Sequence, residues 1–131
     1  MDHNSYCEIT PEILKLAAMT EKAGIIDTEL FTKYEVKRGL RDLNGKGVLA
    51  GLTNISDVRA TKMENGVSVP DHGRLFYRGY DVKDLVGGLP RNEAFGFEEA
   101  TYLLLFDKLP DHDELESFKK MLAGYRTLPT S

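Results

Sequence analysis

The sequence is poor in the residues that hold small secreted domains together. Cys7 is the single cysteine among 131 residues, and there is no tryptophan. With no disulfide partner and no apolar signal segment near the start, the chain is expected to work in a reducing, cytoplasmic compartment. The length fits one domain or a piece of one, and such a domain buries roughly two thirds of its unfolded surface without help from a metal. Cys7 has no basic neighbour to lower its pKa, so we expect an inert thiol.

The sequence also lacks a basic face and a long apolar run. Lysine and arginine number 17 against 21 aspartate and glutamate, which gives a net charge of −4. The one short basic cluster, residues 37–41, is flanked by Glu35 and Asp42. This charge pattern predicts no nucleic-acid partner. The longest uncharged apolar stretch, residues 102–106, is far shorter than the roughly 20 residues of a membrane-spanning helix, so no membrane segment is expected.

Helical signals begin near the start of the chain. Thr10 can cap a helix whose first residue is Pro11, and the pattern predicts that this helix runs to Gly24. Gly24 is expected to leave the helix through a left-handed conformation. The apolar spacing predicts one buried face, made of Ile13, Leu14, Ala17 and Ala18.

Two short helices are predicted further along the chain. Asp27 is expected to cap one that passes through Leu30, Phe31 and Tyr34, and Asp81 to cap another that includes Leu85 and Val86 and stops at Gly87-Gly88.

Two longer helices are predicted near the end of the printed sequence. Residues 97–106 are apolar around nearly the whole circumference of a helix, so the helix has to be covered on all sides. If the helices that cover Leu103, Leu104 and Leu105 are missing, the isolated chain should self-associate or bind a hydrophobic dye. Asp111 and Glu114 have the spacing of a capping box. The helix that follows has an apolar stripe of Leu115, Phe118, Leu122 and Tyr125.

The middle of the chain carries the β signals. Val48–Ile55 and Arg74–Tyr80 are rich in β-branched or aromatic residues and predict two short strands. The segment between them, residues 57–72, is polar and turn-rich around Asn65-Gly66, and we expect an extended surface loop there. The fold class predicted from these signals is mainly α with a small antiparallel β hairpin.

Side-chain patterns give no catalytic, cofactor-binding or metal-binding residue. His3, His72 and His112 have no ligand at metal-site spacing, so we expect no metal and assign them no catalytic role. We interpret them as solvated polar residues.

The glycines near the middle of the chain do not form a phosphate-binding loop. Gly45, Gly47 and Gly51 precede a predicted strand, whereas such a loop follows a strand and opens a helix. They are better explained as turn and strand glycines. The sequon Asn54-Ile55-Ser56 is interpreted as a chance match, given the cytoplasmic expectation.

Several blocks of sequence occur together in one order. The most specific are Tyr-Arg-Gly-Tyr-Asp and the later pair Leu-Leu-Leu-Phe and Lys-Leu-Pro. With their neighbours they occupy Val36–Arg41, Gly47–Ser56, Gly73–Leu85, Phe97–Phe106, Lys108–Pro110, Glu114–Leu115 and Phe118. This pattern, over about Val36 to Leu122, resembles the amino-terminal region of citrate synthases.

The resemblance implies a fold and an activity. Residues 1–131 would be a truncated amino-terminal segment of the all-α citrate synthase fold. The parent would be an acyltransferase of the tricarboxylic acid cycle, a homodimer that condenses acetyl-CoA with oxaloacetate to give citrate and CoA. Acetyl-CoA is then a substrate and no cofactor is implied. The family's catalytic aspartate and two histidines lie beyond the matched region, so the segment alone is expected to be inactive.

Other interpretations stay open. A 2-methylcitrate synthase would use propionyl-CoA, and residues 57–72, longer here than in many members, leave that choice undecided. The alternative to an enzyme segment is a self-contained small helical module that binds or regulates without catalysis. Arg38 or Arg41 could contact CoA phosphates, although a solvated arginine is favoured. Arg78 is expected to be structural, pairing with a carboxylate or a carbonyl.

Overall fold

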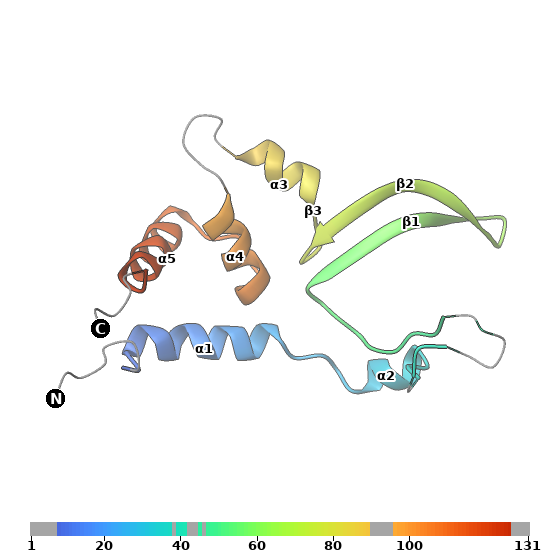
Figure 1. Ribbon diagram of the computed structural model, residues 1–131, viewed down its shortest axis with the longest axis horizontal. Coiled ribbons are helices and arrows are strands. Elements are labelled where there is room, and N and C mark those ends of the chain that lie inside the picture. The colour runs from blue at the N-terminus through green and yellow to red at the C-terminus, as the bar shows by residue number, and fades with distance from the viewer. Residues whose placement is uncertain (1–7, 38, 42–44, 46, 90–95, 127–131) are drawn as a thin grey trace.

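The computed structural model describes residues 8–37, 39–41, 45, 47–89 and 96–126. Along the chain, the helices and strands are α1 (Pro11–Ala23), α2 (Glu29–Lys33), β1 (Ser56–Glu64), β2 (Val67–Tyr77), β3 (Tyr80–Asp81), α3 (Val82–Gly88), α4 (Phe97–Phe106) and α5 (His112–Gly124). Figure 1 shows α1, α4 and α5 gathered into a helical body, while the β1–β2 hairpin projects away from it. The described elements thus confirm helices with a small antiparallel sheet.

Helix α1 begins as predicted but turns a different face inward. The Thr10 hydroxyl accepts a hydrogen bond from the Ile13 amide at 3.2 Å. Leu16 and Met19 pack against the core beside α4 and α5. The predicted face was wrong for three residues that are exposed in the structure: Leu14, Ala17 and Ala18. The residues that face inward are Leu16, Met19 three positions later, and buried Ala23 four positions after that. They face inward because α1 contacts α4.

The end of α1 also differs from the prediction. Gly24 has φ −85° and ψ −8°, a right-handed conformation, and its amide donates to the Thr20 carbonyl at 2.9 Å. The expected left-handed exit was therefore wrong. The last turn of α1 continues in the helical sense, and the chain then leaves toward α2. Asp27 accepts from the Glu29 amide at 2.9 Å, so it does bond the first turn of α2, although Thr28 occupies the cap position.

The core lies where α4 meets α5. The rings of Tyr102, Phe106 and Phe118 pack edge to face, with centroids 4.5–5.9 Å apart. Such geometry is favourable because the positive edge of one ring faces the negative face of another. Leu103 is fully buried, whereas Leu105 remains 41% exposed. Helices α1 and α5 therefore cover part of the apolar α4, and the expected self-association or dye binding stays a prediction.

Side-chain caps fix the first turns of α3 and α5. Asp81 accepts from the Lys83 amide at 2.9 Å. Asp111 accepts from the Glu114 amide at 2.9 Å, and the Glu114 carboxylate accepts from the Asp111 amide at 3.0 Å. These bonds satisfy amides that have no partner within the helix. The predicted cap at Asp81 and the predicted capping box are both confirmed.

The β region corrects the sequence prediction. Residues 57–72 are not an irregular surface loop: most of them form β1 and β2, which pair antiparallel from Ser56↔Tyr77 to Glu64↔Val67. Asn65 and Gly66, at φ 51° and 79°, make the two-residue turn between them. This left-handed pair is the geometry that an Asn-Gly hairpin favours. Strand β3 adds a short third strand beside β2.

The other expected strand is absent. Val48–Ile55 has no strand conformation in the structure, and the chain there is irregular. Arg74–Tyr80 is partly confirmed, because β2 ends at Tyr77 and Tyr80 starts β3. Every residue of β1 is exposed, whereas β2 is half-buried at Val69 and over its last three residues, Leu75–Tyr77. Of the helices in the described ranges, none is both long and apolar enough to cross a membrane.

Candidate functional site

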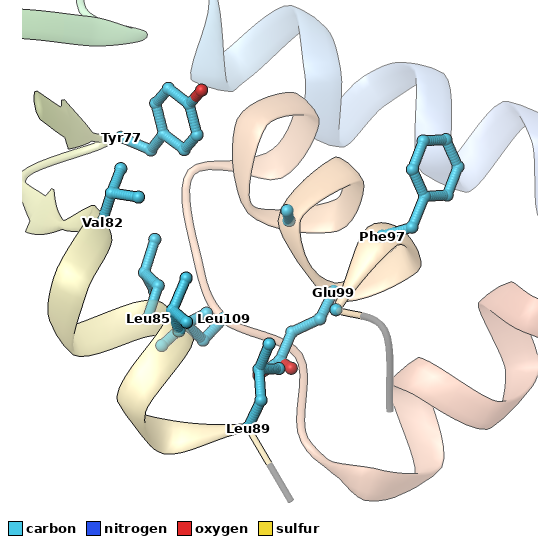
Figure 2. A pocket seen from close by; sticks show the side chains of 10 residues that line it. Tyr77, Val82, Leu85, Leu89, Phe97, Glu99 and Leu109 are labelled. Carbon is cyan, nitrogen blue, oxygen red and sulfur yellow. The ribbon is translucent and has the colours of Figure 1, made fainter. Parts of the chain in front are cut away.

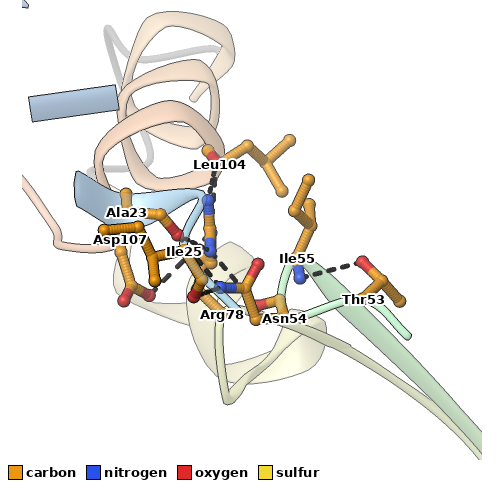
Figure 3. Close-up of polar contacts among 8 residues, drawn as sticks. All are labelled: Ala23, Ile25, Thr53, Asn54, Ile55, Arg78, Leu104 and Asp107. Atoms are coloured by element: carbon orange, nitrogen blue, oxygen red, sulfur yellow. Dashed lines mark hydrogen bonds and ion pairs between the residues drawn. The ribbon is translucent and has the colours of Figure 1, made fainter. Parts of the chain in front are cut away.

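Arg78 lies at a junction of three chain segments, in the turn that joins β2 to β3 (Figure 3). Its backbone has φ 48°, and its amide donates to the Ile55 carbonyl at 2.8 Å. Its side chain is only 3% exposed. A fully charged guanidinium is expensive to bury, so its hydrogen-bond partners decide what it does.

The partners of the Arg78 guanidinium are main-chain carbonyls. Nε and Nη2 donate to the Leu104 carbonyl at 3.1 and 2.9 Å. Nη1 donates to the Ala23 carbonyl at 3.1 Å and to the Asn54 carbonyl at 3.4 Å. The Leu104 and Ala23 carbonyls belong to the last turns of α4 and α1, where the helix dipole favours a positive charge. The prediction that Arg78 is structural and pairs with a carbonyl or a carboxylate is confirmed.

Two more side chains complete this junction. Asp107 places a carboxylate oxygen 3.8 Å from the Arg78 Nε, and Asn54 donates its amide to the Ala23 carbonyl at 3.0 Å. The junction therefore ties the ends of α1 and α4 to the chain just before β1. The Arg78 guanidinium already donates to main-chain carbonyls, so we assign the junction the role of holding the fold together.

The second feature is an apolar groove between α3 and α4 (Figure 2). Its volume is about 290 Å³, at the small end of the range for ligand pockets. Most of its walls are aliphatic or aromatic, and its lining residues are Tyr77, Val82, Leu85, Val86, Leu89, Gly96, Phe97, Glu99, Ala100 and Leu109. Glu99 is the single ionisable carboxylate among them. We call this feature the α3–α4 groove.

The groove has few of the polar groups that acid–base chemistry requires, and they do not converge from one element. A ligand pocket usually places a few convergent polar groups among apolar walls, and catalysis adds a base within hydrogen-bond reach of the reacting proton. The groove offers one carboxylate and one phenol on separate elements, Glu99 on α4 and Tyr77 on β2. Its shape and chemistry suit apolar side chains.

A polar cluster at the start of α5 shifts three pKa values. The hydrogen bond from Lys108 lowers the pKa of Glu114, and the same bond raises the pKa of Lys108. Burial raises the pKa of the Tyr102 phenol, and the charge of Glu114 adds to this. Each shift favours the state that these groups already have near neutral pH, so the cluster supports a cap and offers no proton to a reaction.

The residues considered from the sequence are scattered. His72 is on β2 and His112 opens α5, both exposed, while His3 and Cys7 lie outside the described residues. In the described ranges, no three His, Cys, Asp or Glu side chains are grouped so that they could hold a metal ion.

Of the two candidate CoA-contacting arginines, the structure describes only Arg41. Arg41 donates from Nη1 to the Gly45 carbonyl at 2.8 Å within its own turn, and Arg38 lies outside the described residues. The α3–α4 groove itself was missed by sequence reasoning, because its walls come from residues 77–109 that are brought together only by folding.

Comparison with known proteins gives consistent matches. Residues 40–131 match the family model described as "Citrate synthase, C-terminal domain". The chain is 36% identical over 94 residues to 2-methylcitrate synthase 1 of Corynebacterium glutamicum. This alignment covers 72% of this chain and 19% of the relative. It is 42% identical over 84 residues to the 2-methylcitrate synthase of Shewanella oneidensis, covering 64% of this chain and 18% of that protein.

A third relative is named a citrate synthase. The citrate synthase of Haloferax volcanii is 34% identical over 94 residues, covering 72% of this chain and 19% of the relative. The chain thus spans about a fifth of the length of these curated relatives. No solved structure gives a significant match.

Proposed function

Because the chain belongs to the citrate synthase family, we propose that it supplies one structural segment of an enzyme that condenses an acyl-CoA with oxaloacetate. The observation that carries the proposal is the family match over residues 40–131, which includes α3, α4 and α5. As the sequence resemblance implies, this segment stands at the amino-terminal side of the parent. The parent is a transferase that forms citrate and CoA when acetyl-CoA is the acyl donor.

The chemistry explains why a segment of this kind is inactive alone. The family removes a proton from a weakly acidic methyl group, so the base must act beside donors that stabilise the enolate at once. In the proposed parent, these groups come from the part of the polypeptide that this chain does not match. The scattered placement of His72 and His112 supports this division, as does the carbonyl-bound state of Arg78.

The choice of acyl donor has two candidates. Two of the three relatives described above are named 2-methylcitrate synthases and the third is named a citrate synthase. Propionyl-CoA is therefore an alternative to acetyl-CoA. We further propose that the parent is a cytoplasmic homodimer.

The test is to rebuild the enzyme. The sequence encoding residues 40–131 replaces the matched stretch in the 2-methylcitrate synthase of Shewanella oneidensis, and release of the CoA thiol is followed with oxaloacetate and either acyl-CoA. We expect thiol release that depends on oxaloacetate. A well-folded chimera that releases no thiol with either donor contradicts the proposal. The ratio of rates with propionyl-CoA and acetyl-CoA shows how this segment affects donor preference.

A module that binds or regulates without catalysis is the competing candidate. The α3–α4 groove is the observation that favours it, because an open apolar groove suits a partner protein as well as a missing part of the same enzyme. A chimera that folds and turns over its substrates decides against this candidate.

A further inference from the structure

The α3–α4 groove leaves two large apolar side chains open to water. Val86 on α3 is 63% exposed and Phe97 at the start of α4 is 67% exposed, and both line the groove. We propose that the groove receives the apolar face of a helix from the remaining part of a citrate synthase-family polypeptide. This inference rests on the proposed function and names the surface at which the segment and the remainder meet.

The two walls of the groove meet at one end. Gly96 has φ 69°, and a Cβ on it would lie 2.7 Å from the Leu89 Cδ1. The end of α3 and the beginning of α4 are therefore in close contact at one end of the groove. On the other side, Tyr77 comes from β2 and Leu109 from the chain after α4 (Figure 2). The contact at Leu89 and Gly96 lowers the cost of ordering this end of the groove when a helix binds.

The chemistry of the walls favours a helix over a small molecule. A small ligand needs several polar groups to fix its orientation, and the groove supplies little besides Glu99. A helix needs only apolar pockets for side chains that recur at every third or fourth residue. Glu99 lies among the lining residues and would pair with a lysine or arginine of that helix.

The position of the groove in the family match identifies the partner. Its lining residues run from Tyr77 to Leu109, entirely inside the stretch 40–131 that matches the family. In the curated relatives, the matched stretch makes up 19% of the protein, so the other four fifths or so of the polypeptide adjoins it. That polypeptide has to cover apolar surface left open by the segment, because water contact with such side chains is unfavourable.

The experiment compares two exposed valines. The full 131-residue chain is co-expressed with the Shewanella oneidensis 2-methylcitrate synthase lacking its matched stretch, and the complex is isolated through a tag on the chain and sized by light scattering. Val86→Asp changes the groove, whereas Val58→Asp changes β1, where Val58 is 73% exposed. Both variants are first checked by circular dichroism as isolated chains, in which both sites face water.

We expect a complex with the unchanged chain and with Val58→Asp. Val86→Asp should weaken the complex at least about tenfold, the effect of losing burial of one aliphatic side chain. The proposal is overturned if the unchanged chain gives no complex, or if the two aspartate variants bind alike. In the chimera, Val86→Asp should lower the melting temperature while Val58→Asp does not, and equal melting temperatures also overturn it. A complex sensitive to Val86→Asp but without thiol release contradicts only the proposed function.

Discussion

The helical body and the β1–β2 hairpin are stabilised in different ways within one chain. In the body, Tyr102, Phe106 and Phe118 are buried where α4 contacts α5, and Leu103 of α4 is fully buried as well. In the hairpin, all nine residues of β1 are exposed, and the strands are held by their own backbone pairing and by the turn. A two-stranded hairpin alone is marginal in water. The difference teaches that burial defines the body, while local geometry defines the hairpin.

The largest predicted effect is loss of an aromatic core residue. Phe118→Ala should lower the free energy of unfolding by about 3–5 kcal/mol, because it removes a ring from the three-ring cluster and leaves a cavity. Phe97→Ala is the matched control, since Phe97 is exposed, and it should change stability by about 0.5 kcal/mol or less. Urea unfolding followed by circular dichroism measures both. Equal effects would break the distinction between buried body and open groove.

The second effect concerns the junction between body and hairpin. Arg78→Gln should cost about 1.5–3 kcal/mol, since a charged donor to carbonyls at the ends of α1 and α4 is lost. Arg74→Gln, at an exposed position on β2, is the control and should cost far less. If the two variants unfold at the same urea concentration, the junction does not hold the two regions together.

A third effect is the pH dependence of the body. The lowered pKa of Glu114 means that its contribution to stability is present above its ordinary value of 4.5 and is lost as the pH falls through the folded pKa. The raised pKa of Lys108 means that its contribution is complete below 10.5 and is lost as the pH rises through the folded pKa. Thermal unfolding measured from pH 3 to 6 should show the melting temperature falling as the pH is lowered.

The matched variant for this prediction is Glu114→Gln. Gln retains an acceptor for the Asp111 amide but does not titrate. In this variant, the melting temperature should depend less steeply on pH between 3 and 6. An unchanged slope would contradict the assignment to Glu114.

The smallest effect is expected in the hairpin. Val58→Thr keeps β-branching at an exposed site of β1 and should change stability by about 0.5 kcal/mol or less. Hydrogen exchange gives the sharper view: amides of β1 should exchange faster than those of α4, because the hairpin opens without unfolding the body. Equal protection of the two elements would show that the hairpin is part of the same cooperative unit.

Local signals in the sequence predicted the helices well. Thr10, Asp81 and Asp111 each bond the backbone of the first turn that follows, because a cap depends on residues only two or three positions away. The Tyr-Arg-Gly-Tyr-Asp block correctly pointed to a structural Arg78. These inferences did not depend on how the helices and strands pack against one another.

The features that sequence reasoning missed depend on tertiary contacts. The hairpin at residues 56–77 was mistaken for a loop because β1 is exposed throughout and β2 is half-buried only at Val69 and at its end, so no regular alternation of apolar and polar residues marks it. Asn65-Gly66 was the one signal that could have revealed it. The inward face of α1 was misassigned because only the position of α4 decides that Leu16 turns inward and Leu14 outward. The α3–α4 groove joins elements whose contact no local pattern predicts.

We propose that this chain is a segment of an acyl-CoA-condensing enzyme and that it does not catalyse the reaction by itself. The most direct measurement is release of the CoA thiol by the purified 131-residue chain, with oxaloacetate and acetyl-CoA or propionyl-CoA. We predict a rate equal to that of the mixture without protein, for both donors. Oxaloacetate-dependent release that stays with the chain through purification would contradict the account.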